Sequence, residues 1–559
     1  MKRKSSRLPV SLLLGWLLLG SLVGCGAPAT PAGTNAPPTI AAIFQDETGP
    51  SPTPAGATPS PAASPAPAAD VVVQVDVNRD VWPISPLIYG LSEADAAYAA
   101  AVRPTLLSWG GNPSTRYNWR LGNAWNAGSD YLYLNGNYGV PAGVNAADEF
   151  VRFAADNQIV ARMVVPTLGW VASNDDSATC SFPLPGGGCG DGDGANCANP
   201  IQIADPTLAN VPSDVDDVIA WLEHLQQEVG SLPQYVALDN EPELWGYTHY
   251  DVHPTCTTYQ EILDKYLTYA SALRAAFPSL LLTGPITCCW YYYWDSAAGP
   301  ADKAAHGDED FLPWFLQQVA AHDAANGVRT LDVLDLHYYP EGLYNNEVDE
   351  ETAAWRLRST RSLWDPSYVD ESWIARPVTL LPRMRSLIET HYPGTLLGLS
   401  EWNWGADDTM NGALAIADVL GILGRERADF AAYWRQPPLD SPGFYAFQLY
   451  TNYDGAGGRF GDTSAYAQPD DLARVSSFAA LDSASGALHL VLLNKLPNQA
   501  LTVRLDLAGF QAAPAGQQYR YQAGQRSIEA GSVTLAPAGT VLTLPAYSIT
   551  HLVLPAVQD

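Results

Sequence analysis

Two glutamates are notable because each directly follows a short apolar run and is itself followed by Trp. Glu241 lies in the segment LDNEPELW (residues 238–245), and Glu401 lies in LSEWNWG (residues 399–405). Cleaving a glycosidic bond with retention of configuration needs two carboxyl groups about 5–5.5 Å apart. One carboxyl gives a proton to the leaving oxygen, and the other attacks the anomeric carbon. Glu241 and Glu401 are therefore the candidate pair, although a structural ion pair is the ordinary role of a lone glutamate.

These glutamates need a scaffold that brings distant strand ends together. Apolar runs alternate with segments of helical periodicity, of which the clearest, 213–230, has Ser213 as its expected N-cap and Gly230 as its stop. This alternation predicts a (β/α)8 barrel, with a doubly wound open sheet as the alternative. A dinucleotide site is not expected, since no Gly-x-Gly-x-x-Gly follows the first strand. The eight expected strands are 86–90, 105–109, 159–166, 235–238, 280–286, 331–336, 395–399 and 430–434.

Glu241 and Glu401 follow the fourth and seventh expected strands, which would face each other across a closed barrel. After about residue 465 the helical periodicity stops, and short strands separated by Gly, Pro, Asn and Asp predict a β-sandwich. The alternating strand 71–77 is expected to join it, so that both chain ends build one domain. We therefore expect the strand segment at 71–84, the catalytic barrel at 85–464 and the sandwich at 465–559. The sandwich strands are expected at 473–481, 488–493, 501–507, 518–522, 532–535 and 541–554.

The composition argues against several classes of partner. The 559 residues include 29 Lys and Arg against 59 Asp and Glu, which gives a formal net charge of −30. Nucleic acid and anionic lipid both require a basic face, so we expect neither as a charge-driven partner. Only 16% of residues are charged and 47% are hydrophobic, which predicts folded domains and not an acidic tail. The 17 Trp and 28 Tyr suit stacking on sugars, although some must be core.

The first 24 residues resemble a bacterial lipoprotein signal peptide. Basic residues precede an apolar run at 12–19, and LVGC then places Cys25 where lipidation would occur. The apolar run is short for a membrane span of about 20 residues, which disfavours the alternative of a transmembrane anchor. Residues 25–70, rich in Pro, Ala, Ser and Thr, predict an extended linker. We expect an exported monomer, anchored at the cell surface through Cys25 or released, that touches membrane only through its lipid.

Six further cysteines could form disulfides in an exported protein, in pairings that the sequence leaves open. The segment 191–196 is similar to part of a calcium loop, with Asp191, Asp193 and Asn196 as candidate ligands of a structural calcium. The alternative is a polar turn bordered by cysteines. Two-carboxylate chemistry itself needs no cofactor. The six cysteines are Cys180, Cys189, Cys197, Cys256, Cys288 and Cys289.

Asn240-Glu241-Pro242 and Glu401 together resemble the clan A retaining glycoside hydrolases. Within that clan, four segments in order are similar to glycoside hydrolase family 44, the endoglucanase and xyloglucanase family. The resemblance runs from about residue 71 to the C-terminus, and it implies a barrel with an appended β-sandwich. The four segments are WGGNPSTRYNW (109–119), LDNEPELW (238–245), SLWDPSYVDESW (362–373) and SEWNWG (400–405).

The resemblance implies that Glu241 is the acid/base, that Glu401 is the nucleophile and that Asn240 binds the sugar 2-hydroxyl. Clan members often place a His and a Tyr beside the nucleophile, so the resemblance makes His337 and Tyr339 further candidates. Position 402 is Trp where Tyr is common, which puts a hydroxyl hydrogen bond from that position to the nucleophile in doubt.

Several other residues after strand ends are candidates for substrate binding. Asn112 and Arg116 could bind sugar hydroxyls or brace Glu401, although Arg116 could equally pair with Asp130. Glu243 is expected to brace its loop. Aromatic residues near strand ends are expected either to stack on pyranose rings or to pack the barrel mouth. The tryptophans chosen as substrate-binding candidates are Trp170, Trp245, Trp402 and Trp434.

The favoured hypothesis is a retaining endo-β-1,4-glucanase that hydrolyses cellulose-like glucan, xyloglucan or both, with a β-glucan polysaccharide as its partner. A second hypothesis, from a different class, is a surface glycan-binding lipoprotein without turnover. A third keeps the mechanism but acts on xylan, mannan or mixed-linkage glucan. The intact Glu241/Glu401 pair favours an enzyme, because a pure binding protein needs neither carboxyl.

Overall fold

The computed structural model describes residues 68–536 and 539–557. The predicted signal peptide, Cys25 and nearly all of the predicted linker lie outside the described residues. Within the described ranges, none of the helices has the length and apolar character needed to cross a membrane.

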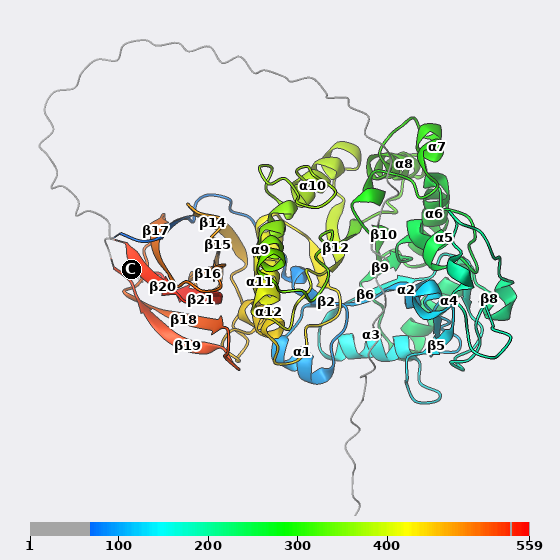
Figure 1. Ribbon diagram of the computed structural model, residues 1–559, viewed down its shortest axis with the longest axis horizontal. Coiled ribbons are helices and arrows are strands. Elements are labelled where there is room, and N and C mark those ends of the chain that lie inside the picture. Colours follow the sequence, from blue (N-terminus) through cyan, green and yellow to red (C-terminus); the bar gives the residue numbers. More distant parts are fainter. Residues whose placement is uncertain (1–67, 537–538, 558–559) are drawn as a thin grey trace, which may run out of the picture.

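The centre of the molecule is a closed barrel of eight parallel strands (Figure 1). Each strand pairs with its sequence neighbour, and the last pairs with the first through the contact between Ala432 and Gly90. This closure confirms the predicted (β/α)8 barrel and excludes the open sheet. In chain order the strands are β2 (Gly90–Leu91), β3 (Leu106–Trp109), β6 (Val160–Val165), β9 (Tyr235–Leu238), β10 (Leu281–Thr287), β11 (Val333–Tyr338), β12 (Leu396–Trp402) and β13 (Phe430–Tyr433).

The first barrel strand is shorter than the sequence predicts. The expected strand 86–90 is replaced by a 3-10 turn over Pro86–Ile88, because Pro86 fixes the backbone at the first position and the Ser85 hydroxyl accepts a hydrogen bond from the Leu87 amide at 3.2 Å. Only Gly90–Leu91 pairs with neighbouring strands. A Cβ at Gly90 would collide with the Ala431 carbonyl oxygen, so the barrel can close here only through glycine.

Helices surround the barrel. The N-cap of α4 (Val215–His224) is Asp214 and not the expected Ser213, because the Asp214 carboxylate accepts hydrogen bonds from the amides of Asp216 and Asp217. At the other end of this helix, a π-helical turn over Leu225–Val229 leads to Gly230. The longer helices are α1 (Ala96–Val102), α3 (Ala146–Asp156), α4 (Val215–His224), α6 (Tyr259–Ala276), α8 (Phe311–Asn326), α9 (Glu350–Ser359), α10 (Leu380–His391), α11 (Met410–Arg425) and α12 (Pro442–Thr451).

Both described ends of the chain build a nine-stranded β-domain. Strand β1 lies between β14 and β17, antiparallel to the first and parallel to the second, as expected for a sheet that takes one strand from the N-terminal side. The sheet order is β19-β18-β21-β16-β15-β14-β1-β17-β20, and residues from β1, β16, β20 and β21 share one apolar core. The strands are β1 (Val71–Asp76), β14 (Thr463–Pro469), β15 (Val475–Leu481), β16 (Leu488–Asn494), β17 (Leu501–Ala508), β18 (Ala515–Gln522), β19 (Glu529–Thr534), β20 (Thr540–Leu544) and β21 (Ser548–Leu554).

Two strands of this domain differ from the sequence-based prediction. The single strand expected at 541–554 is two strands, since the chain turns after Pro545 and β20 and β21 pair with different neighbours. Strand β14, which was not expected, begins at Thr463.

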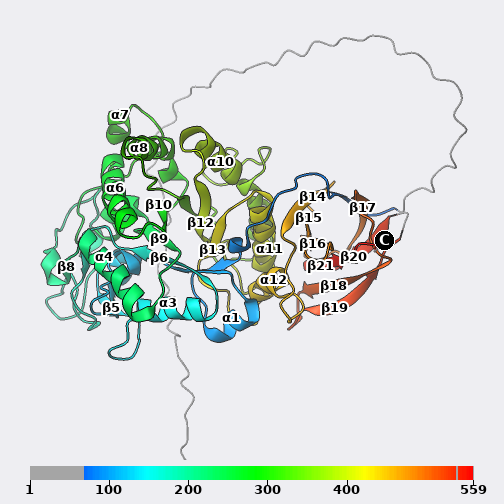
Figure 2. The same cartoon turned by 180° about the vertical axis from the view of Figure 1, so that it is seen from behind.

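The barrel and the β-domain are packed together through α11 (Figures 1 and 2). Every residue from Met410 to Gly424 is buried, because the helix is covered by the barrel, by α9 and α12, and by β15 and β16. A side chain at Gly421 would collide with the Phe478 ring, so this glycine sets how closely α11 approaches β15. Apolar residues of both parts form one continuous core, which makes the β-domain a rigid support for the barrel.

Candidate active site

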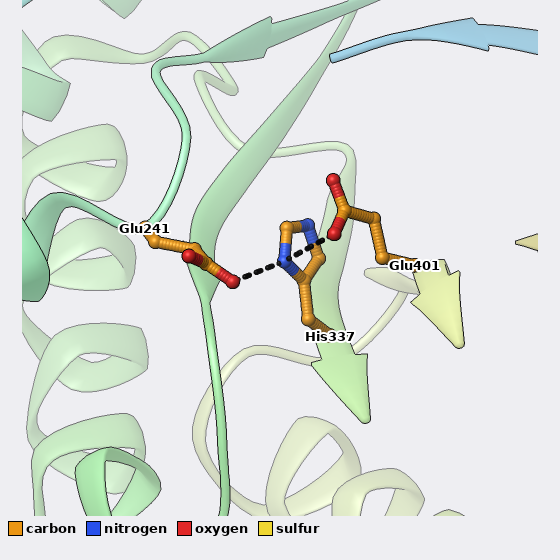
Figure 3. A group of neighbouring side chains, drawn as sticks. All are labelled: Glu241, His337 and Glu401. Atoms are coloured by element: carbon orange, nitrogen blue, oxygen red, sulfur yellow. Dashed lines mark hydrogen bonds and ion pairs between the residues drawn. The ribbon is translucent and has the colours of Figure 1, made fainter. Parts of the chain in front are cut away.

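The mouth of the barrel brings Glu241, His337 and Glu401 into one cluster (Figure 3). One carboxylate oxygen of each glutamate and one ring nitrogen of His337 all lie within 4.8 Å of one another. His337 Nδ1 is 2.8 Å from Glu241 Oε1 and 3.4 Å from Glu401 Oε2. Glu241 comes just after β9, His337 from β11 and Glu401 from β12. The fourth and seventh strands therefore deliver the two predicted carboxyls to the same place.

The backbone that carries Glu241 is strained and firmly held. Asp239 and Glu241 have φ values of 72° and 47°, a left-handed conformation that costs a non-glycine residue on the order of 1–3 kcal/mol. The Glu241 amide donates to the Ile286 carbonyl at 3.1 Å. The buried Asp239 carboxylate accepts hydrogen bonds from Thr115 Oγ1, Thr167 N, Leu168 N, Asn240 N and Trp245 Nε1. One carboxylate thus ties the ends of the second, third and fourth barrel strands into the turn that presents Glu241.

Glu401 lies in a buried and charged environment, with only 6% of its surface exposed. The Tyr339 hydroxyl donates to Glu401 Oε2 at 2.9 Å. Burial raises the pKa of Glu401 to about 7; the positive charge of His337 opposes the shift, and the charge of Glu241 adds to it. Burial alone would lower the pKa of His337, but Glu401 and Glu241 beside it raise that pKa overall. The two carboxyl groups therefore favour the protonated, positively charged form of the imidazole.

A buried ion pair inside the barrel supports Glu401 from below. Arg162 donates through Nε and Nη2 to Asp335 Oδ2 at 2.9 and 2.7 Å, and through Nη1 to Ser108 Oγ at 2.9 Å. Asp335 Oδ1 accepts from the Ser400 amide at 3.1 Å, next to Glu401. This ion pair was not predicted from the sequence. The sequence feature that could have indicated it is a charged residue within each of two largely apolar strands, Arg162 in VARMVV and Asp335 in VLDLHY.

Asn240 and Asn112 form a polar chain beside the glutamates. Asn240 Nδ2 donates to Asn112 Oδ1 at 3.0 Å, and Asn112 Nδ2 donates to Asp130 Oδ2 at 2.6 Å. Asn240 Oδ1 is buried and accepts no hydrogen bond from any described residue. The amide is therefore fixed through its nitrogen, and its oxygen can still accept a hydrogen bond.

Three residues predicted to bind substrate are buried in the scaffold instead. Arg116 is fully buried, and its Nη1 pairs with Asp251 Oδ2 at 2.7 Å, not with Asp130. Trp245 donates through Nε1 to Asp239. Trp402 is fully buried and packs edge-on against Tyr433, with ring centroids 4.8 Å apart. The prediction that these side chains contact sugar is therefore wrong, because each fills the interior that holds the strand ends in place.

The other two predicted tryptophans are half-buried and keep accessible surface. Trp434 follows β13, and its ring lies directly against Gly111, where any Cβ would collide with it. Gly111 has φ 78°, a conformation that favours glycine independently of this contact. Trp170 begins β7 (Trp170–Ala172), which pairs with β8 (Asn210–Pro212) outside the barrel.

Glu243, two residues beyond Glu241, is also buried but points to a different partner. Its Oε1 accepts a hydrogen bond from the Cys288 amide at 2.5 Å, which links the loops that follow β9 and β10. Burial raises the pKa of Glu243 to about 8. Glu243 therefore braces the two loops.

Disulfides fix the long loops around this mouth. The bonds are Cys180–Cys189 and Cys197–Cys256, while the adjacent Cys288 and Cys289 are buried. In the predicted calcium loop, Asp191 Oδ1 accepts from the Asp193 amide at 3.0 Å, and Asn196 Oδ1 accepts from the amides of Ala198 and Asn199. These bonds shape two turns, and calcium binding here stays a prediction.

We expect Glu243 to make the stability of the protein depend on pH. The folded-state pKa of about 8 lies above the ordinary value of 4.5, so the folded state keeps a proton that the unfolded state releases. The free energy of unfolding should therefore fall as pH rises from about 4.5 to about 8. Glu243→Gln should reduce this fall, whereas Glu223→Gln, on the exposed face of α4, should not. Melting temperatures measured across this range test it, and an equal fall in both variants would contradict it.

Comparison with known proteins places the chain in a family. The family model described as glycoside hydrolase family 44 matches residues 124–342. Endoglucanase A of Paenibacillus lautus is 29% identical over 534 residues, which cover 89% of this chain and 74% of that protein. Beta-mannanase/endoglucanase A of Caldicellulosiruptor saccharolyticus is 28% identical over 481 residues, or 78% of this chain. The chain spans only 35% of the length of this second relative.

Solved structures agree over both the barrel and the β-domain. CelM2, a bifunctional glucanase-xylanase from a metagenome library, is 35% identical with a TM-score of 0.83, and the match covers 87% of this chain and 99% of that one. A Paenibacillus polymyxa xyloglucanase from glycoside hydrolase family 44 is 28% identical with a TM-score of 0.75, over the same shares of the two chains. The chain therefore belongs to glycoside hydrolase family 44.

Proposed function

We propose that this protein is a retaining endo-β-1,4-glucanase that hydrolyses cellulose-like glucan, xyloglucan or both. The observation that carries the proposal is the approach of a Glu241 oxygen to a Glu401 oxygen within 4.8 Å. Inverting enzymes hold their carboxyls about 6.5–9.5 Å apart to admit a water molecule, whereas retaining enzymes hold them about 5–5.5 Å apart. The short separation supports direct attack by one carboxylate on the sugar.

In this mechanism Glu401 attacks the anomeric carbon while Glu241 gives its proton to the leaving glycosidic oxygen. The carbon–oxygen bond to the leaving chain breaks as the bond to Glu401 forms. Glu241, now ionised, then takes a proton from water, whose oxygen displaces Glu401 and restores both groups. Tyr339 and His337 both contact Glu401 Oε2, so Oε1 is the attacking atom.

Double displacement requires Glu401 to be ionised and Glu241 to hold the proton. Burial raises the pKa of Glu401 to about 7, the positive charge of His337 opposes the shift, and the charge of Glu241 adds to it. Protonation of Glu241 removes that last contribution and so favours the ionised form of Glu401. His337 contacts both carboxyls through Nδ1 and can stabilise the charge on either as the reaction moves it.

Substrate contacts follow from the groups that stay available. Asn240 Oδ1 can accept a hydrogen bond from the sugar 2-hydroxyl, a contact that strengthens in the transition state. Trp434 and Trp170 keep exposed ring surface for stacking on pyranose rings. Relatives named as endoglucanase and xyloglucanase favour a β-glucan backbone. The names glucanase-xylanase and beta-mannanase keep xylan and mannan as alternatives, and product profiles on each polymer separate them.

The proposal includes the setting predicted from the N-terminus. We infer an exported lipoprotein that is held at the cell surface through Cys25, with residues 25–70 as a spacer between the anchor and the barrel. A polysaccharide too large to enter the cell would then be cut outside it.

Replacing the nucleophile should separate hydrolysis from binding. In Glu401→Gln, reducing-sugar release from xyloglucan and carboxymethylcellulose should fall by at least about 10³-fold, because no carboxylate remains to attack. Retention in an affinity gel containing the same polymers should stay near that of the unmodified protein. Glu223→Gln serves as the matched control on an exposed helix face. Undiminished hydrolysis by Glu401→Gln would overturn the mechanism.

Substituting Gly111 should weaken substrate binding through Trp434. A Cβ at position 111 collides with the Trp434 ring, so Gly111→Ala should displace the ring and raise KM on xyloglucan about 10-fold, which corresponds to about 1.4 kcal/mol. Gly230→Ala is the matched control, since Gly230 has φ 76° against 78° at Gly111 but has open space around it. Equal KM values in the two variants would show that Trp434 has no such role.

A further inference from the structure

A cavity opens between the loop after β10 and the first turn of α10 with the residues that precede it. It encloses about 270 Å³, and Trp290, Trp294, Arg376 and Arg383 form part of its wall. The loop that carries the two tryptophans is tied to the catalytic cluster, because the Tyr293 hydroxyl donates to the His337 carbonyl oxygen. The cavity therefore lies at the same end of the barrel as Glu241 and Glu401.

The charges around this cavity are unevenly paired. Lys303 bridges the Asp295 and Asp310 carboxylates at 3.0 and 2.8 Å, so the two acidic groups of the wall already share a cation. In the described ranges, neither Arg376 nor Arg383 forms an ion pair. Three cations against two carboxylates leave an excess of one positive charge here, on a protein whose formal net charge is −30.

The two arginines are close enough to influence each other. Burial lowers the pKa of Arg383, and the charge of Arg376 lowers it further, with Asp310 opposing the shift only in part. Arg383 is held by hydrogen bonds to the carbonyl oxygens of Val378 and Pro377 at 2.9 and 3.2 Å. One guanidinium is therefore positioned by the backbone and the other is exposed beside it, an arrangement that an anion between them would stabilise.

The two arginines lie over the tryptophan rings of the wall. The guanidinium carbons of Arg376 and Arg383 lie 5.4 and 5.7 Å from the centroid of the Trp290 ring, and Arg383 lies 5.8 Å from that of Trp294. Both indoles are more than nine-tenths buried, so they fix the positions of the arginines and leave little ring surface for a ligand. A guanidinium fork matches a carboxylate through two parallel hydrogen bonds, so the arginines carry the recognition. The volume lies just below the roughly 300 Å³ of small drug-sized sites, which suits a single sugar.

We propose that this cavity binds a carboxylate-bearing sugar, a uronic acid branch of a polysaccharide, with Arg376 and Arg383 receiving the carboxylate. The acidic surface of the protein repels an anionic polymer in general, so an acidic branch needs a local cationic site of this kind. The inference rests on the proposed function for its setting and bears on the xylan alternative kept there, because the probe polymer, glucuronoxylan, is a xylan with uronic acid branches. Its test requires binding alone and no turnover.

The test compares two forms of one polymer in affinity gels, with Glu401→Gln as the parent so that nothing is hydrolysed. The probes are glucuronoxylan and the same glucuronoxylan after chemical reduction of its carboxyl groups. The parent should be retained more strongly by the carboxylate form. Adding Arg376→Gln should weaken that retention about 5- to 10-fold and leave retention by the reduced polymer unchanged. Arg376 is exposed and forms no side-chain hydrogen bond with a described residue, so this variant should fold, as its melting temperature would show.

The control variant removes a positive charge elsewhere. Arg526→Gln, at an exposed position of the β-domain, makes the same change in net charge far from the cavity and should leave retention unaltered. Equal retention of the two polymers by the parent would overturn the proposal, as would equal losses in Arg376→Gln and Arg526→Gln. Failure of the proposed hydrolysis would show separately, as absent reducing-sugar release by the unmodified protein.

Discussion

The structure depends on holding two carboxyl groups close together in a buried place. At roughly 5 Å and an effective dielectric constant of about 20, two unit negative charges repel by about 3 kcal/mol. The Glu241/Glu401 pair can therefore persist only with a shared proton, a neighbouring cation or both. His337 supplies the cation when it is protonated, and the hydroxyl of Tyr339 supplies a hydrogen bond to Glu401. The chemistry proposed for this site uses the same compensation, because the negative charge moves from one carboxyl to the other during the reaction.

The barrel is built to keep that arrangement from relaxing. Asp239 gathers hydrogen bonds from segments after three different strands and holds Glu241 in a left-handed conformation that would otherwise be costly. The Arg162–Asp335 ion pair similarly holds the strand that carries Glu401, and both of its side chains are almost completely buried. A buried pair of this kind contributes little net stability but penalises the loss of either partner strongly, so it favours a single arrangement of the strands. The β-domain adds stiffness through helix α11, which is buried from Met410 to Gly424.

The parts of the fold and site that could be predicted from the sequence are those with local signals. A glutamate directly after an apolar run marks the end of a strand, and the ends of parallel strands in a barrel lie together. Glu241 and Glu401 could therefore be assigned to one barrel mouth. Strand β2 could not be bounded, because Pro86 makes a turn out of residues whose apolar character predicts a strand. Trp245 and Trp402 were misassigned since a tryptophan at a strand end can point inward or outward with the same neighbours in sequence. The partner of Arg116 was equally hidden, because Asp251 is 135 residues away and only the folded loops bring the two together.

The central claim is that the close carboxyl pair attacks the sugar directly, and the stereochemistry of the first product tests it most directly. A proton NMR time course on a β-1,4-linked gluco-oligosaccharide resolves the anomeric signals before mutarotation mixes them. Double displacement through Glu401 predicts that the β-anomer of the new reducing end is formed first and that the α-anomer grows only later, by mutarotation. Initial formation of the α-anomer would contradict the account, since it would require a water molecule between two carboxyls that the structure holds too close to admit one.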